Sequence, residues 1–170
     1  VLDDEDREVP PGTPGNLVGR SLTMMSGYKN RPDKTAEAQW IDPATGEAWM
    51  RMGDIGRVDA DGFVELVGRA KDMIISGGFN IYPSDLEAEL LKEPGVMEAA
   101  VVGVPSRAWG ETPVGFVVLK DGGDPAAILA SVNARLGKTQ RLSALHRIEE
   151  MPRSHIGKLL KTELRARLSV

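Results

Sequence analysis

Residues 68–87 read Gly68-Arg69-Ala70-Lys71-Asp72-Met73-Ile74-Ile75-Ser76-Gly77-Gly78-Phe79-Asn80-Ile81-Tyr82-Pro83-Ser84-Asp85-Leu86-Glu87, and this stretch decides the fold. Its first five residues carry almost no apolar bulk, so we interpret them as a linker, although a plain turn has the same composition. A short apolar run, a Ser-Gly-Gly loop and the expected start of a helix follow. The stretch therefore marks a change from one kind of structure to another.

Upstream of this stretch, the sequence is typical of turn-rich β structure. Residues 1–68 are rich in Gly, Pro and Asp and contain only short apolar runs. Residues 16–20 and 48–51 predict strands. Asp61-Gly62 lies between apolar flanks and predicts a hairpin whose returning strand is residues 63–67.

Downstream of the linker, the pattern is that of mixed α and β structure. Residues 73–75 predict a short strand, and residues 99–104 and 114–119 predict buried strands. Asp124-Pro125 predicts a helix start, with a capping Asp and Pro at the first helical position. A last helix is expected after Lys158. The sequence thus predicts a small α+β domain with helices packed on a short sheet.

The helix ends carry further expectations. Ser84 and Glu87 have the spacing of a capping box at the start of a helix that places Leu86 and Leu90 on one face. Gly137 is expected to end the second helix in the left-handed conformation.

Composition excludes some classes of function. The chain has no cysteine, which excludes disulfides, thiolate metal sites and a cysteine nucleophile. A net charge of -4 argues against a protein that tracks nucleic-acid phosphates. No apolar run approaches the roughly 20 residues that span a bilayer, and the acidic start is unlike a signal peptide. We expect a cytoplasmic protein, and the absence of an initiator Met is consistent with a truncated one.

Three short motifs could carry chemistry, although each alone has a simpler structural explanation. Asp54, in a glycine-flanked loop, could accept hydrogen bonds from a ribose diol or could stabilise a turn. Gly77-Gly78 could let backbone approach a ligand or could form a tight turn. Lys158 follows a Gly and could reach a phosphate or be solvated. His146 and His155 lack partners at metal-ligand spacing, so no metal site is expected.

These motifs occur in the order and spacing of the adenylate-forming superfamily, which includes acyl- and aryl-CoA synthetases, luciferases and peptide-synthetase adenylation domains. Residues 49–56 resemble the family's loop ending in Gly-Asp, residues 68–87 its hinge and following signature, and residues 152–158 its terminal Pro-x-x-x-x-Gly-Lys segment. Gly27-Tyr28 with Pro32 and Thr35 fits the usual lead-in. The resemblance covers essentially the whole chain and is strongest to the acyl-CoA synthetases.

The resemblance implies two domains. Residues 1–70 would be the β-rich end of a large N-terminal domain, and residues 71–170 the small mobile C-terminal domain of an AMP-binding enzyme. The missing part of the large domain would hold the phosphate loop, the adenine pocket and most of the acyl pocket. This chain alone is therefore expected to be inactive.

The resemblance also implies a two-step reaction with ATP, CoA and a carboxylic acid as substrates, and with Mg²⁺ accompanying ATP. Asp54 would bind the ribose hydroxyls, and Arg69 the ribose or a phosphate. Lys158 would be the catalytic lysine of adenylation. Lys71 matches the hinge about which the small domain rotates between the two steps.

The CoA contacts implied by the resemblance lie around the Gly77-Gly78 loop at the thiol tunnel. Trp109 matches a position that contacts CoA in some relatives, but a packing role explains it equally well. The family's aromatic-Lys-x-Pro segment is replaced here by Gly137-Lys138-Thr139-Gln140-Arg141. Arg141 could still meet a phosphate, so CoA contacts in this region stay open.

Other classes stay open too. A peptide-synthetase adenylation domain would use a carrier-protein thiol, and a luciferase-type activity is a rarer variant. A non-enzymatic interaction or dimerisation module could derive from the same fold. The acid substrate and a possible homo-oligomeric state cannot be read from the sequence.

Overall fold

The computed structural model describes residues 1–120 and 122–168. The chain separates into two compact units, Val1–Lys71 and Asp72–Val170. The short 3-10 turn η1 (Ala70–Asp72) lies at the boundary between them. Each unit is described by itself below.

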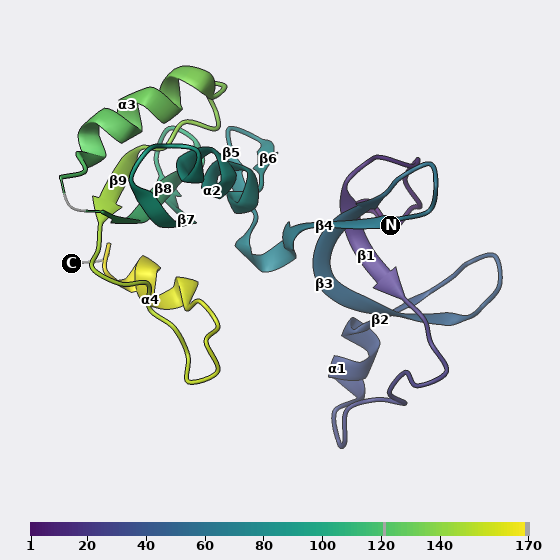
Figure 1. The fold of residues 1–170 in the computed structure, drawn as a ribbon. Helices are drawn as coiled ribbons and strands as arrows, with labels where there is room; N and C mark the ends of the chain where they lie inside the picture. Colours follow the sequence, from purple (N-terminus) through teal and green to yellow (C-terminus); the bar gives the residue numbers. More distant parts are fainter. Residues whose placement is uncertain (121, 169–170) are drawn as a thin grey trace. The chain divides into compact units, whose positions relative to one another are not determined.

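The first unit is a small antiparallel sheet organised around one long strand. Its elements are β1 (Gly15–Gly19), α1 (Pro32–Glu37), β2 (Gln39–Ile41), β3 (Ala48–Val58) and β4 (Val64–Arg69). Strand β3 pairs antiparallel with each of the other three strands and is strongly bent (Figure 1). The predicted strands are present, and β3 extends well beyond the predicted residues 48–51.

The hairpin between β3 and β4 is confirmed. The Asp59 carboxylate accepts the backbone N–H groups of Asp61 and Phe63, each at 2.9 Å. Gly62 has φ +88°, a conformation that glycine adopts without steric cost. Helix α1 and strand β2 were not predicted, because α1 has six residues and buries none of them.

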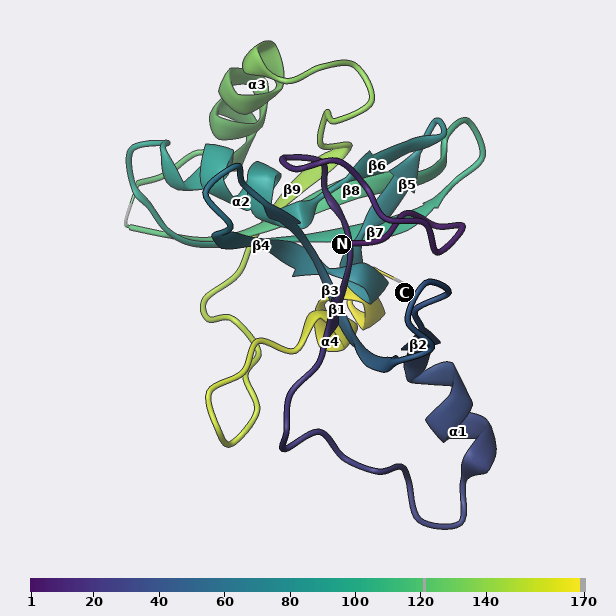
Figure 2. The ribbon, with the colours of Figure 1, turned by 90° about the vertical axis from the view of Figure 1, so that its right-hand side faces the viewer.

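The second unit contains the larger sheet. Its elements are β5 (Ile74–Ser76), β6 (Phe79–Ile81), α2 (Pro83–Leu91), β7 (Val96–Ser106), β8 (Gly110–Leu119), α3 (Pro125–Arg135), β9 (Ala144–Arg147) and α4 (Lys161–Ala166). The sheet runs in the order β6-β5-β8-β7, and β9 adds to β8 in parallel. The long strand β8 pairs with β5, β7 and β9, and the antiparallel β7–β8 pair is the longest pairing of the sheet (Figure 2).

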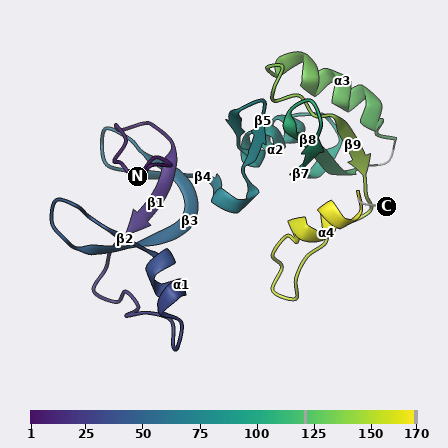
Figure 3. The ribbon, with the colours of Figure 1, turned by 180° about the vertical axis from the view of Figure 1, so that it is seen from behind.

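Alternating residues of β7 and β8 contribute to two separate hydrophobic cores, because successive side chains of a strand point to opposite faces of the sheet. Val101 and Val117 pack with the apolar faces of α2 and α3 on one side of the sheet. Val102 and Phe116 pack with Leu164 of α4 on the other side. The figures show α3 and α4 on opposite sides of the sheet (Figures 1 and 3). The predicted α+β fold with helices on a short sheet is confirmed.

One of the predicted helix ends is confirmed and two are wrong. Asp124 caps α3 by accepting the Ala126 N–H at 2.9 Å. The capping box is wrong, because Tyr82 is the N-cap of α2 and the Glu87 carboxylate instead accepts the Val101 N–H at 2.9 Å. Gly137 is not in the left-handed conformation, because the chain leaves α3 through an extended residue, Leu136. Among the described residues, no helix has the length and apolar character needed to cross a bilayer.

Candidate functional site

Asp54 and Arg69 lie directly opposite each other on β3 and β4. Arg69 Nη1 is 2.9 Å from Asp54 Oδ1, and the side chains are 51% and 22% exposed. Asp54 was predicted to lie in a loop, but it lies within β3. The structure thus places a hydrogen-bond acceptor for hydroxyls beside a guanidinium that suits phosphates.

An irregularity in β3 explains how Asp54 is presented. In the β1–β3 pairing, Asn16 opposes Ile55 and Val18 opposes Arg51, so a single β1 residue faces three on β3. Gly53, within this bulge, has φ +71°. Bulges bend a strand and re-aim its side chains, and they recur beside binding sites. The glycine before Asp54 therefore serves the backbone geometry of the bulge.

Gly77 and Gly78 form the two-residue turn between β5 and β6, with φ +60° and +82°. Two positive φ values are those of a type I′ hairpin turn, whose twist matches that of the strands. The Gly77 N–H donates to the Trp109 carbonyl at 2.8 Å. A Cβ at Gly77 would lie 2.8 Å from Cε3 of the Trp109 ring. The structure thus brings together Gly77 and Trp109, which are 32 residues apart in sequence.

The segment after α3 reaches the same place. The ammonium of Lys138 lies 5.6 Å from the Trp109 ring centroid, within cation–π range. The Thr139 methyl would be 3.5 Å from a Cβ at Gly77. Asn133 holds the end of this segment, because its side chain exchanges two hydrogen bonds with the Leu142 backbone, at 2.8 and 2.9 Å. Arg141 lies exposed on the same segment.

Lys138 was missed by sequence reasoning as a neighbour of Trp109. The one feature of the sequence that pointed to Lys138 was its place in the segment that departs from the family pattern. Lys138 and Trp109 are far apart in sequence, so local patterns could not predict their contact. The cluster of Gly77, Trp109, Lys138 and Thr139 combines an aromatic face, a cation and accessible backbone. Such a surface can contact an extended, phosphate-bearing ligand.

Lys158 lies exposed near the end of the loop that joins β9 to α4, which extends away from the sheet in Figure 3. The Ser154 N–H donates to the Lys158 carbonyl at 2.8 Å, and the Ser154 hydroxyl accepts the Lys158 N–H at 3.1 Å. Gly157 has φ +81° and donates to the Ser154 carbonyl at 2.8 Å. The loop therefore closes on itself and presents Lys158 to solvent.

Lys71 is exposed and is the last residue of the first unit. Asp72 begins the second unit and pairs with Arg165 of α4 at 3.2 Å. Most of the predicted site residues thus fall into three groups: Asp54 with Arg69, the Gly77-Gly78 turn with Trp109, and Lys158 with its loop. Lys71 lies outside these groups at the boundary of the units, and Arg141 lies on the segment after α3.

The two histidines lie in different surroundings. The His146 ring packs against Phe116 with centroids 5.4 Å apart, and His155 is exposed in the Lys158 loop. Among residues 1–120 and 122–168, no group of three or more His, Asp or Glu side chains could hold a metal ion.

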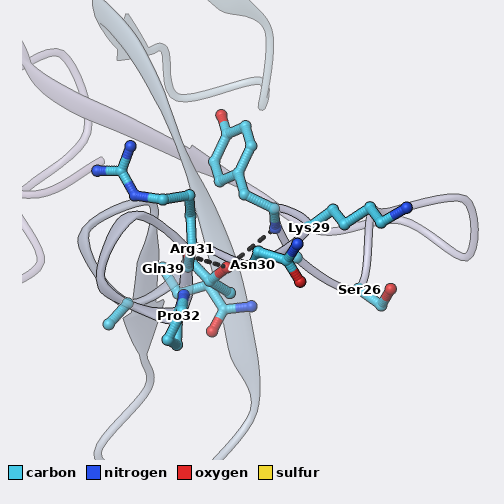
Figure 4. Close-up of a pocket in the computed structure, with 10 residues that line it drawn as sticks. Ser26, Lys29, Asn30, Arg31, Pro32 and Gln39 are labelled. Atoms are coloured by element: carbon cyan, nitrogen blue, oxygen red, sulfur yellow. Dashed lines mark hydrogen bonds between the residues drawn. The ribbon is translucent and has the colours of Figure 1, made fainter.

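A hollow of about 690 Å³ lies on the first unit, and Asp54 is not among the residues that line it. The lead-in residues Gly27, Tyr28, Pro32 and Thr35 line it, and the Thr35 hydroxyl accepts the Tyr28 N–H at 2.9 Å. Figure 4 shows Lys29 extending away from the other lining side chains. The lead-in motif therefore forms one local structure held by Thr35.

The chain is similar in sequence and in fold to known proteins. Residues 85–158 match the family of the AMP-binding enzyme C-terminal domain. A long-chain-fatty-acid–CoA ligase of Escherichia coli is 40% identical over 97% of this chain and 28% of its own length. A sulfoacetate–CoA ligase of Cupriavidus necator is 39% identical over 96% of this chain and 32% of its own length. The ATP-bound crystal structure of MatB from Rhodopseudomonas palustris has a TM-score of 0.88 and 32% identity, and the match covers 98% of this chain and 32% of MatB.

An AMP-binding enzyme C-terminal domain therefore occupies most of the second unit. The chain as a whole is similar to the C-terminal part of CoA ligases of the adenylate-forming superfamily. It spans 28% to 32% of the length of these curated relatives. The two named ligases act on a long-chain fatty acid and on sulfoacetate, so similarity in this part does not distinguish between acids.

Proposed function

We propose that this chain is the C-terminal portion of an ATP-dependent carboxylic acid–CoA ligase that forms an acyl-adenylate and then an acyl-CoA. The observation that carries the proposal is the exposed Lys158 on its self-closed loop, at the end of the segment that matches the family. A lysine presented in this way can enter the site of another domain as a point charge.

In the first step, a substrate carboxylate attacks the α-phosphate of ATP and pyrophosphate leaves. Negative charge spreads over the phosphoryl oxygens, so positioned cations supply much of the catalysis. Lys158 would bridge the substrate carboxylate and phosphate oxygens. Asp54 would accept hydrogen bonds from the ribose hydroxyls. Arg69, on the neighbouring strand β4, would contact the ribose or a phosphate.

In the second step, the CoA thiol attacks the acyl carbon and AMP leaves. We propose that the second unit rotates about Lys71 between the steps, which would withdraw Lys158 and bring the Gly77-Gly78 turn to the thiol channel. The absence of a side chain at Gly78, where a Cβ would meet nothing within 4 Å, would leave room for the pantetheine arm. Trp109 would flank that arm, and Arg141 could meet a CoA phosphate.

Among the described residues, no cluster of three or more acidic or histidine side chains could hold the Mg²⁺ expected with ATP. The phosphate loop, the adenine pocket and most of the acid pocket would lie in the remainder of the enzyme. The 170-residue chain would then be inactive alone.

The proposal is tested by ATP–pyrophosphate exchange with a panel of carboxylic acids, run on the 170-residue chain and on the complete reading frame that encodes it. We expect exchange only from the complete protein. Exchange by the isolated chain would show that it holds a whole ATP site, contrary to the proposal. If the complete protein showed no ATP–pyrophosphate exchange with any acid, the result would favour a non-enzymatic interaction module.

A further inference from the structure

The base of the Lys158 loop is fixed, but its far end is exposed. Pro152 is buried, and its carbonyl accepts the Leu160 N–H at 2.8 Å. An isolated β-bridge joins Arg153 to Leu159. Beyond this bridge, Ile156 is 76% exposed. The internal hydrogen bonds of the loop set its shape, but they do not set how its end is oriented on the sheet.

The Arg153 side chain connects the loop to the sheet. Arg153 Nη1 donates to the carbonyl of Gly157 at 3.1 Å, and its other amino group forms an ion pair with Glu98. Glu98 lies near the start of β7 and pairs with Val118 of β8, directly after a register shift in the β7–β8 pairing. The planar guanidinium therefore connects the residue before Lys158 to strand β7 of the sheet.

We propose that Arg153 is a positioning residue for Lys158: anchored on Glu98, it holds the Gly157 carbonyl and so aims the lysine that follows. The inference rests on the proposed role of Lys158 in adenylation. Arg153 and Glu98 are 49% and 40% exposed, and an ion pair with that much solvent access contributes little to the stability of the fold. Its effect should therefore appear in the placement of Lys158 and not in folding.

The test measures both half-reactions in the complete ligase. Arg153→Ala should slow formation of the acyl-adenylate by about 100-fold, the cost typical of a displacement near 1 Å. Thioester formation from supplied acyl-adenylate should stay unchanged, because Lys158 is withdrawn in that step. Arg153→Lys should fall between Arg153→Ala and the wild type, since an ammonium lacks the planar fork that serves both partners.

Glu98→Gln separates positioning from direct contact with ATP. It should slow adenylation in the wild type but add little in the Arg153→Ala background, because both changes break one connection. Arg167→Ala, which removes an exposed arginine from the same unit, is the matched control and should change neither half-reaction.

Hydrogen exchange in the 170-residue chain supplies a readout independent of activity. Arg153→Ala should speed exchange of the Lys158 amide while the amides of β7 and β8 keep their protection. Unchanged exchange at Lys158, equal loss in both half-reactions, or normal adenylation in Glu98→Gln would each overturn the inference. Absence of activity in the wild-type ligase would instead count against the proposed function, and the exchange result would still decide the role of Arg153.

Discussion

The N–H of Gly77 donates a 2.8 Å hydrogen bond to the carbonyl of Trp109, and the Trp109 ring covers the position that a side chain on Gly77 would occupy. Gly78 follows in the same turn, also with positive φ, but a Cβ there would meet nothing within 4 Å. Two adjacent glycines thus share a backbone requirement and differ in what covers them.

This difference predicts unequal costs for the same substitution. Gly78→Ala should cost roughly 1–2 kcal/mol, the penalty for placing an L-residue in the left-handed region. Gly77→Ala should cost about 1–3 kcal/mol more, because its Cβ would lie 2.8 Å from the Trp109 ring, which must then shift. Urea unfolding of the 170-residue chain measures both values. Equal midpoints for the two variants would contradict the close packing of Trp109 on Gly77.

A larger residue at Gly77 should also affect one half-reaction of the complete ligase. Gly77→Val should slow transfer of the acyl group to CoA while leaving acyl-adenylate formation near the wild-type rate, because the turn is proposed to line the thiol channel only in the second step. Single-turnover assays of each step make the comparison. A variant with normal CoA turnover would remove Gly77 from the channel.

Lys158→Ala should abolish adenylation and largely spare thioester formation from supplied acyl-adenylate. Loss of one preorganised charge contact in a transition state typically costs about 100- to 1,000-fold in rate. Lys120→Ala, an exposed lysine in the same unit, is the matched control and should behave as wild type. Equal loss in both steps would mean that Lys158 does not act in adenylation alone.

Glu87 should be required for the stability of the second unit. Its carboxylate accepts the N–H of the fully buried Val101 at 2.9 Å and pairs with Lys161 at 2.7 Å. Glu87→Ala leaves a buried N–H without a partner and should cost about 1–3 kcal/mol. Glu87→Gln keeps an acceptor and should cost less. Denaturation midpoints that coincide for the two variants would show that the ion pair, and not the hydrogen bond, dominates.

The ion pair between Arg51 and Asp6 should make the first unit less stable in acid. Arg51 donates to both carboxylate oxygens of Asp6, at 2.7 and 2.8 Å, and these hydrogen bonds hold the pKa of Asp6 below its usual range. A lowered folded-state pKa stabilises the fold above the unfolded value of about 3.9. That stabilisation is lost as pH falls through the folded-state pKa.

Arg51→Gln should therefore raise the pKa of Asp6 toward its ordinary value, as followed by NMR titration of the carboxyl carbon. Asp42 is the internal control, because the Thr45 hydroxyl and the Ala44 N–H lower its pKa without Arg51. A shift of Asp42 equal to that of Asp6 would indicate a general loss of structure.

The patterns that local chemistry enforces were predicted well. Asp124-Pro125 begins a helix because the cap and the fixed φ of Pro act within a few residues. Leu86 and Leu90 are buried together because one helical turn separates them. Ser84 and Glu87 show the limit of such reasoning. Their spacing allows a capping box, but Glu87 binds a strand and a helix that are distant in sequence.

The sequence by itself determined the α+β class, the resemblance to the adenylate-forming superfamily and the order of the motifs, because these depend on residue types at fixed local spacing. Only the tertiary structure decided that Arg69 faces Asp54, that Trp109 covers Gly77 with Lys138 over its ring, and that Arg153 links the Lys158 loop to Glu98. Each of these contacts joins residues 15 or more positions apart. Strand register, loop closure and burial set such contacts together, and no single stretch of sequence encodes them.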